Sequence, residues 1–219
     1  MRPRKKKNLD ERLTAVSSLL IKKSEIETRK IDYKAIFPEM PPDSPIDLEI
    51  GCGKGSFAIA RTERYPERRY IAVEKISDII VTALEKAMEE QKPNLRFMNI
   101  DATVLFEILE EASIDTLFIN FCDPWSKARH HKRRLTYKSF LEGYKRFLKL
   151  GGKIEFKTDN RDLFDFSVEE FKNCGYQLEF VTYDLHSSDY ATDNIMTEYE
   201  KNFSSKGFKI NKLIAKFVG

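Results

Sequence analysis

The stretch that decides the fold is residues 46–55, which read Ile-Asp-Leu-Glu-Ile-Gly-Cys-Gly-Lys-Gly. The mostly apolar run 46–50 predicts a buried strand. Glycines at 51, 53 and 55 then permit a tight turn and let a ligand approach the backbone closely. Residues 58–64 favour a helix. The stretch therefore predicts a strand, a glycine loop and a helix, which together form the opening unit of an α/β fold.

Apolar runs and longer amphipathic segments alternate on the carboxyl side of this unit. Strands are predicted at 46–50, 69–73, 95–100, 115–121, 152–156, 176–183 and 209–217. Helices are predicted at 58–64, 77–90 (with Ser77 as N-cap), 104–111, 137–148 and 161–173. Such alternation indicates βαβ units and a mostly parallel sheet, which binds ligands at the carboxyl ends of its strands.

Length and composition indicate one soluble domain with an extension before it. The chain has 219 residues, of which 41% are hydrophobic and 33% charged. Residues 1–40 are polar and begin with a basic run, and an apolar seam there predicts a short amphipathic helix (Leu9, Leu13, Val16, Leu20). Prolines between 38 and 45 mark a linker. We therefore expect a basic, helical extension at 1–40 and a single domain at 41–219.

Several classes of protein are disfavoured by the sequence. No apolar run approaches the ~18 residues that span a bilayer, and no apolar segment of a secretory signal follows the basic start. Three widely spaced cysteines without a CxxC pair argue against a disulfide framework and a zinc site, and fit the cytoplasm. Net charge is only +3, but cations cluster at 2–7 and 127–134. Local basic patches of this kind are typical of nucleic-acid binding.

Carboxylates end the first three predicted strands, at Glu49, Glu74 and Asp101. The glycine spacing is GxGxG, which differs from the dinucleotide fingerprint, and no Gly-Lys-Ser/Thr follows as in a P-loop. Glu49 would repel a pyrophosphate. A carboxylate at 74 can accept both hydroxyls of a ribose, and one at 101 can accept an adenine amino group. With the backbone of Gly51, these acids fit S-adenosylmethionine, which carries a ribose, an adenine and a cationic end.

A carboxylate, an indole and five cations follow the fourth strand within residues 123–134, Asp-Pro-Trp-Ser-Lys-Ala-Arg-His-His-Lys-Arg-Arg. We expect Asp123 to face the reactive end of the cofactor and to stabilise charge on a nitrogen that accepts a methyl group. Guanine N7 carries no proton, so its methylation requires no general base. We interpret His130 and His131 as RNA-facing or structural. The cations suit phosphates, which position a nucleic acid without reading its sequence (Lys127, Arg129, Lys132, Arg133, Arg134).

Two later acidic segments are candidates for reading a base. Guanine presents two adjacent donors, N1–H and the 2-amino group, which carboxylates can accept. Asp159 follows the fifth strand, and Thr197-Glu198-Tyr199-Glu200 precedes the last strand. Each segment could instead be a helix cap or a surface feature, and Asp159 could cap the helix that begins near Arg161.

The motifs DLEIGCGKG, AVEK, NIDA, FCDPWSKARHHKRR, FKTDN and TEYEKNF occur in order between residues 47 and 203. Together they resemble the bacterial tRNA (guanine-N7-)-methyltransferase family, over most of the chain. The resemblance implies a Rossmann-like class I methyltransferase fold, with a seven-stranded, mostly parallel sheet and helices on both faces. It implies methylation of guanosine at position 46 in the tRNA variable loop, with S-adenosylmethionine as cofactor and no metal.

The resemblance also assigns roles to residues. Glu49, Glu74, Asp101 and Asp123 would contact the cofactor, and Asp123 would be catalytic. Lys127, Asp159 and Thr197–Glu200 would contact the substrate, and the run 129–134 would meet RNA. Ser126 stands where the family has a second proline, which frees a φ angle and restores a backbone donor, so we expect a more mobile loop.

Two other readings remain open from the sequence. The same cofactor could serve an exocyclic amine of RNA or a protein side chain, although such enzymes carry a second proline after the Asn/Asp-Pro of this motif. The chain could also be a non-catalytic RNA-binding protein on the same scaffold. A homodimer is possible, and no membrane partner is expected.

Overall fold

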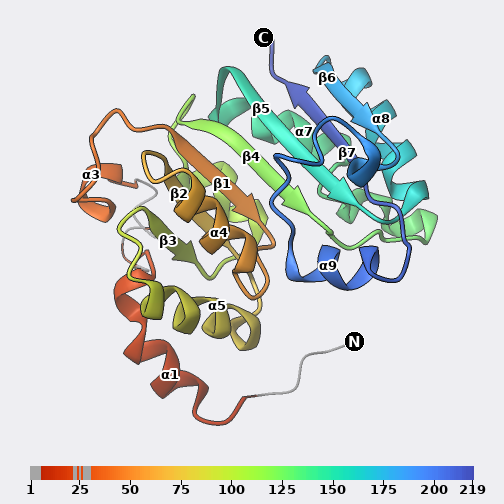
Figure 1. The fold of residues 1–219 in the computed structure, drawn as a ribbon. Helices are drawn as coiled ribbons and strands as arrows, with labels where there is room; N and C mark the ends of the chain where they lie inside the picture. Colours follow the sequence, from red (N-terminus) through yellow and green to blue (C-terminus); the bar gives the residue numbers. More distant parts are fainter. Residues whose placement is uncertain (1–5, 22–23, 25, 27–30) are drawn as a thin grey trace. The chain divides into compact units, whose positions relative to one another are not determined.

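The computed structural model describes residues 6–21, 24, 26 and 31–219 (Figure 1). The chain divides into two compact units, Met1–Glu110 and Glu111–Gly219. Residues 1–5, which hold most of the predicted basic run, lie outside the described residues.

Three parallel strands form the sheet of the first unit, in the order β3-β2-β1. Every residue of β1 and β2 is buried, because helices cover these strands and leave no polar face. The elements are β1 (Ile46–Ile50), α4 (Ser56–Arg64), β2 (Arg69–Val73), α5 (Ser77–Glu90), β3 (Leu95–Met98), the 3-10 turn η2 (Ala102–Val104) and α6 (Leu105–Ile108).

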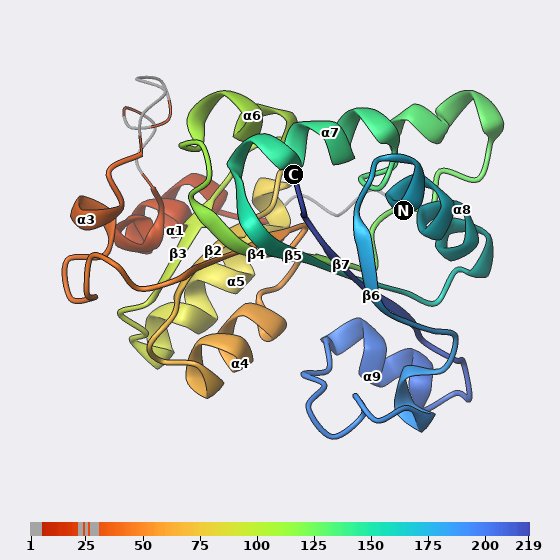
Figure 2. The same ribbon diagram turned by 90° about the horizontal axis from the view of Figure 1, so that it is seen from above.

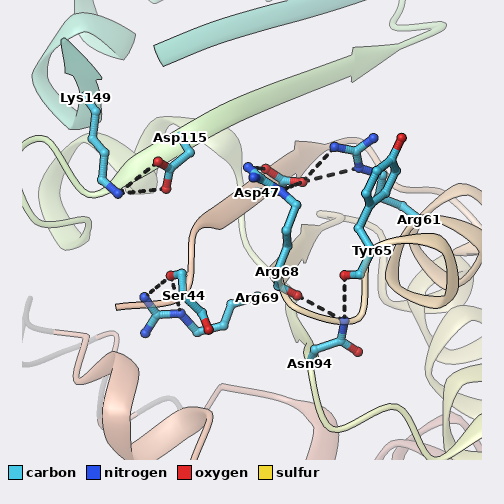
Figure 3. Close-up of polar contacts among 9 residues, drawn as sticks. All are labelled: Ser44, Asp47, Arg61, Tyr65, Arg68, Arg69, Asn94, Asp115 and Lys149. Carbon is cyan, nitrogen blue, oxygen red and sulfur yellow. Dashed lines mark hydrogen bonds and ion pairs between the residues drawn. The ribbon is translucent and has the colours of Figure 1, made fainter. Parts of the chain in front are cut away.

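A buried carboxylate fixes the start of β1 (Figure 3). Asp47 is fully buried and accepts hydrogen bonds from the guanidinium groups of Arg61, at 3.2 Å, and Arg68, at 2.9 Å. Arg61 also lies 3.9 Å from the ring centroid of Tyr65. Asp47 thereby ties its strand to helix α4 and to the loop before β2.

The segment before β1 packs along the outer strand of this unit. Helix α1 (Leu9–Ala15) is followed by the 3-10 turn η1 (Ser17–Leu19), so the predicted helix ends before Leu20. Leu20 instead forms a parallel bridge with Phe97, and the Ile21 N–H donates to the Phe97 carbonyl at 2.9 Å. The backbone pairing covers part of an edge that would otherwise be open to other chains. A short helix, α3 (Tyr33–Ile36), follows.

Four strands form the sheet of the second unit, in the order β4-β5-β7-β6. Strands β4 and β5 are parallel, and β7 is antiparallel to both of its neighbours. Helices α7 and α8 lie on one side of these strands and α9 on the other (Figure 2). The elements are β4 (Ile114–Asn120), η3 (Ala128–Arg133), α7 (Lys138–Phe147), β5 (Leu148–Thr158), α8 (Arg161–Asn173), β6 (Gln177–Thr182), η4 (Leu185–Ser187), α9 (Glu198–Ser204) and β7 (Asn211–Lys216).

The predicted fold class is confirmed: in the described part of the chain seven strands alternate with helices, pairing is parallel throughout the first unit, and in the second unit β7 is antiparallel to its neighbours. Several details differ. Strand β5 begins at Leu148, earlier than predicted, because the chain passes from α7 directly into the strand. The predicted helix 104–111 is reduced to η2 and the four-residue α6, and α9 was not predicted. Within the described part of the chain, no helix combines the length and apolar character needed to cross a membrane.

Replacing Asp47 with asparagine should lower the free energy of unfolding by about 3 kcal/mol, because the two guanidinium groups then lose a buried counter-charge. Urea unfolding followed by circular dichroism measures the change. A matched control is Asp165→Asn, which breaks an exposed pair with Arg161 and should change stability by no more than about 0.5 kcal/mol. Equal decreases in the free energy of unfolding in both variants would show that the buried Asp47 ion pairs do not stabilise the fold more than an exposed pair does.

Candidate functional site

The glycine loop after β1 leaves open space beside its backbone. Gly51 and Gly53 have φ angles of 82° and 57°, which L side chains rarely adopt, and a Cβ atom added to either would meet nothing within 4 Å. Gly55 differs, since its added Cβ would lie 2.7 Å from the Cβ atom of Ala83 on α5. The first two glycines therefore leave room for a ligand, whereas Gly55 permits helix packing.

Glu74, which follows β2, faces this loop. Its carboxylate accepts the Gly53 N–H at 3.3 Å and the Ile76 N–H at 2.9 Å. Because a carboxylate has about four acceptor positions, it keeps capacity for the two hydroxyls of a ribose. Asn99 donates to the Glu74 carbonyl at 2.8 Å and accepts from the Ser77 hydroxyl at 2.7 Å. Ser77 was predicted to be the N-cap of α5, but it is the first residue of the helix, and its hydroxyl instead donates a hydrogen bond to Asn99. Sequence reasoning missed Asn99.

Asp101 lies at the end of the third predicted strand and is exposed. Its Oδ1 atom accepts from the backbone N–H and the hydroxyl of Thr103, at 3.0 and 2.8 Å, which caps the turn η2. The backbone hydrogen bond from Thr103 is the main reason that the Asp101 pKa lies below its ordinary value. Lys75 lies 4.0 Å from the Oδ2 atom, which is the oxygen that remains for an amino group.

Glu49 is almost fully buried, at 1% exposure, and accepts the Tyr70 hydroxyl at 3.2 Å. Burial raises the pKa of the neighbouring Cys52 thiol, and the charges of Glu49 and Glu74 raise it further. Two carboxylates therefore make the glycine loop electronegative. These two acceptor groups fit a ligand with ribose hydroxyls and a cationic end and do not fit a pyrophosphate.

The second unit presents Asp123 on the loop after β4, where the side chain is exposed. Phe121 and Trp125, two residues away on either side, have φ angles of 53° and 43°. This left-handed conformation is strained for bulky residues. Burial raises the pKa of the adjacent Cys122 thiol to about 12, and the charge of Asp123 adds to the effect. Cys122 is therefore no thiolate nucleophile at neutral pH.

The cations of the loop separate into two groups. Four are exposed around η3: Lys127, Arg129, Lys132 and Arg133. Arg134 is only 4% exposed, donates to the Pro124 carbonyl at 2.9 Å and lies 4.3 Å from the Phe166 ring centroid. Burial lowers its pKa. Arg134 thus closes the loop on itself and does not face solvent.

Three aromatic contacts organise the same loop. The Trp125 ring meets His130 edge-on at 5.8 Å, and the Arg133 guanidinium lies 5.1 Å from the Trp125 centroid. His131 contacts the Phe166 ring at 5.7 Å. Both histidines are half-buried, and Ser126 is exposed.

Asp159 follows β5 beside helix α9. Its Oδ2 atom accepts the Tyr199 hydroxyl at 3.4 Å. Partial burial and the charge of Asp159 raise the Tyr199 pKa. The predicted cap of α8 is wrong, because Asn160 accepts the Leu163 N–H at 2.8 Å. Asp159 therefore does not cap the helix, and its hydrogen-bond partner Tyr199 is exposed, as is Glu198 beside Tyr199 on α9.

Glu200 is fully buried within a polar network. Its carboxylate contacts Lys157 Nζ at 2.7 Å, His186 Nε2 at 2.9 Å and Asn194 Nδ2 at 2.6 Å. Thr197 forms a capping box with Glu200 at the start of α9. Thr197 and Glu200 therefore hold the segment in place, while the residues between them face outward.

Among the described residues, no group of three or more His, Cys, Asp or Glu side chains could hold a metal ion.

The Glu200 network makes stability sensitive to acid. Burial acts to raise the Glu200 pKa, but the charge and hydrogen bonds of Lys157, together with His186 and Asn194, leave it lowered. The folded state then binds fewer protons, so its stabilisation is present above the ordinary pKa of 4.5 and is lost as pH falls below it. Glu200→Gln should cost about 3 kcal/mol at pH 7.

The test compares the free energy of unfolding of wild type and Glu200→Gln at pH 7 and at about pH 4. The difference in free energy of unfolding between the two proteins should be smaller at about pH 4 than at pH 7. Glu198→Gln, on the exposed face of the same helix, serves as control and should leave stability nearly unchanged. If that difference were the same at the two pH values, the Glu200 carboxylate would not be the group that makes stability sensitive to acid.

Sequence comparisons place the chain among methyltransferases. Residues 43–213 match a family model described as "Putative methyltransferase". A tRNA (guanine-N(7)-)-methyltransferase of Listeria innocua serovar 6a is 44% identical over 218 residues, covering 99% of each chain. Relatives of the same name are 41% identical in Lactococcus lactis subsp. cremoris, over 100% of this chain and 99% of that one, and 47% identical in Lachnoclostridium phytofermentans, over 79% and 81%.

Solved structures support the fold. The chain is similar to an antibiotic-related methyltransferase, with a TM-score of 0.62 and 16% identity over 91% of this chain and 96% of that one. It is also similar to the 16S rRNA methyltransferase KamB, with a TM-score of 0.63 and 12% identity over 86% and 95%. At these identities the likeness concerns the fold alone. With the sequence relatives matched from end to end, the chain belongs to the bacterial tRNA (guanine-N7-)-methyltransferase family.

Proposed function

We propose that the protein is an S-adenosylmethionine-dependent tRNA methyltransferase that forms N7-methylguanosine at position 46 in the variable loop. The observation that carries the proposal is the electronegative glycine loop, which has open space at Gly51 and Gly53 and the Glu74 carboxylate facing it. The full-length relatives named tRNA (guanine-N(7)-)-methyltransferase support guanine N7 of tRNA as the atom that accepts the methyl group. As a tRNA-modifying enzyme, it would act in the cytoplasm.

Residues of the first unit would hold the cofactor. Glu74 has the free acceptor capacity for ribose hydroxyls, and the Oδ2 atom of Asp101 suits the adenine amino group. Glu49 and the backbone of Gly51 suit the cationic methionine end. When bound, S-adenosylmethionine supplies an electrophilic methyl group on a positively charged sulfur.

Asp123 is the proposed catalytic residue and the fourth acid for the cofactor. Guanine N7 offers a lone pair in the ring plane, so no protein group has to remove a proton from it. Transfer leaves positive charge on the guanine ring. An exposed carboxylate on a loop braced by Arg134 can orient the acceptor and stabilise that charge.

Residues of the second unit would bind the tRNA. The exposed cations in and just before η3 suit phosphates, with the half-buried His130 and His131 beside them (Lys127, Arg129, Lys132, Arg133). Asp159 would accept the N1–H and 2-amino donors of guanine, with Tyr199 and Glu198 beside it. Thr197 and Glu200 would serve substrate binding indirectly, by fixing the segment that carries these side chains.

The proposal is tested by incubating the protein with unmodified tRNA transcripts and methyl-labelled cofactor, followed by nucleoside analysis and mapping. We expect a 7-methylguanosine peak at position 46, and its loss in a transcript with adenosine there. Asp123→Asn should bind tRNA normally while losing most turnover. Label in 2-methylguanosine or in protein would indicate another acceptor, and absence of cofactor binding in calorimetry would favour an RNA-binding protein without catalysis.

Two neighbouring arginines should behave differently. Arg133→Ala should weaken tRNA binding and reduce the slope of log affinity against log salt by about 1, as expected for a lost phosphate contact. Arg134→Ala should leave that slope unchanged and lower kcat, because the carbonyl before Trp125 loses its donor. Arg134→Lys should recover little of the kcat lost in Arg134→Ala, since an ammonium lacks the planar guanidinium fork. Equal salt slopes for Arg133→Ala and Arg134→Ala would refute the distinction.

A further inference from the structure

A row of four aromatic rings extends from the end of β4 along helix α9 to the loop before β7. Phe121 lies 4.9 Å from Tyr199 between ring centroids, and Tyr199 stacks on Phe203 at 4.1 Å with an interplanar angle of 14°. Phe203 in turn lies 5.5 Å from Phe208. All four residues belong to the second unit, and α9 lies beside the carboxyl ends of β4 and β5 in Figure 1.

The outer end of this row is open to solvent. Phe208, the last ring of the row, is 54% exposed, and Tyr199, within the row, is 42% exposed. A turn at the end of α9 presents the Phe208 ring: the Phe208 N–H donates to the Phe203 carbonyl at 3.2 Å and the Gly207 N–H to the Ser204 carbonyl at 2.9 Å. This is the Schellman pattern, in which an apolar contact between the two flanking residues accompanies the hydrogen bonds.

Helix termination alone requires only one face of Phe208. An aliphatic side chain would make the same contact with Phe203, and the remaining half of the ring serves no packing purpose in the described structure. The exposed ring therefore suits a ligand that covers an aromatic face.

The charge around the outer end of the row, away from Asp159 and Glu198, indicates the chemistry of that ligand. Residues 201–209 contain three exposed lysines and no acid (Lys201, Lys206, Lys209). The Lys206 ammonium lies 5.6 Å from the Phe203 centroid. Lys209 pairs with Asp184 at 3.2 Å, while 73% of its side chain stays exposed. Stacked aromatic rings bordered by cations are the features that bind unpaired nucleotides.

We propose that the row formed by Tyr199, Phe203 and Phe208 is a stacking platform for an unpaired nucleobase of the substrate RNA, with Lys201 and Lys206 facing its phosphates. The inference rests on the proposed function and extends the Thr197–Glu200 segment, through Tyr199, to two rings outside both that segment and the basic loop, Phe203 and Phe208. Phe208 is the outermost ring, and it receives the base on its exposed face. Because stacking depends on an aromatic face and not on hydrogen bonds, the platform tolerates different bases.

The test is a set of substitutions at Phe208. Phe208→Ala and Phe208→Leu should each weaken binding of a tRNA transcript about tenfold, while Phe208→Tyr stays close to wild type. The salt slope should be unchanged in all three, since no charge is removed, whereas Lys206→Ala should reduce it by about 1. Leucine retains the apolar contact with Phe203, so it separates stacking from helix termination even if the alanine variant folds poorly.

Two controls complete the design. Binding of heparin, a polyanion without bases, should not change in Phe208→Leu. Leu150→Ala, which removes another exposed apolar side chain, should leave tRNA binding unchanged. Full affinity in Phe208→Leu, a parallel loss of heparin binding, or a change in oligomeric state in place of RNA affinity would overturn the platform. Because binding is measured without methyl transfer, a missing 7-methylguanosine product would count against the proposed function and not against this surface.

Discussion

The ion pair between Lys157 and Glu200 is the interaction on which the second unit's candidate site depends. Lys157 belongs to β5 and Glu200 to α9, and both side chains are almost inaccessible to water. Such a pair stabilises a fold only when its remaining hydrogen-bonding positions are filled. Here the Ile195 carbonyl and the Asn194 side-chain oxygen accept hydrogen bonds from the Lys157 ammonium. The Glu200 carboxylate in turn contacts His186 Nε2 and accepts from the Asn194 side-chain nitrogen. The segment that carries Tyr199 is held against the strand that leads to Asp159 by this network.

In the proposed function, the first unit would bind the cofactor and the second unit the RNA. In the first unit, carboxylates lie at or just beyond the ends of three parallel strands, and that of Glu74 contacts the glycine loop through the Gly53 N–H. In the second unit, an exposed acid and a set of cations lie on a loop braced by Arg134, and exposed aromatic rings lie on and after helix α9, which the Lys157–Glu200 pair holds. Each proposed binding surface thus has its own structural support: parallel strand pairing and the buried Asp47 carboxylate in the first unit, and the buried Arg134 and Lys157 side chains in the second.

The strand-ending acids, the glycine loop and the basic loop could be predicted from sequence because each follows an apolar run of clear period. The roles of Arg134 and Glu200 could not. Adjacent arginines look alike in sequence, and only the approach of Phe166 and the Pro124 carbonyl separates Arg134 from Arg133. Glu200 meets Lys157 across 43 residues, a distance at which no local pattern operates. The sequence of helix α9 does contain one recognisable feature, the capping-box pattern Thr-x-x-Glu. The helix has only seven residues, however, which are too few to show the spacing of apolar residues that identifies a helix.

The strained backbone at Phe121 and Trp125 has a consequence for engineering. Left-handed φ angles at non-glycine residues cost of order 1–2 kcal/mol each, so glycine at either position would relieve strain and, considered alone, favour a more stable protein. Yet these two rings contact Tyr199 and His130, on either side of Asp123. Selection for heat resistance and selection for turnover would therefore pull this loop in opposite directions, and a thermostable variant obtained through glycine here would be the less active one.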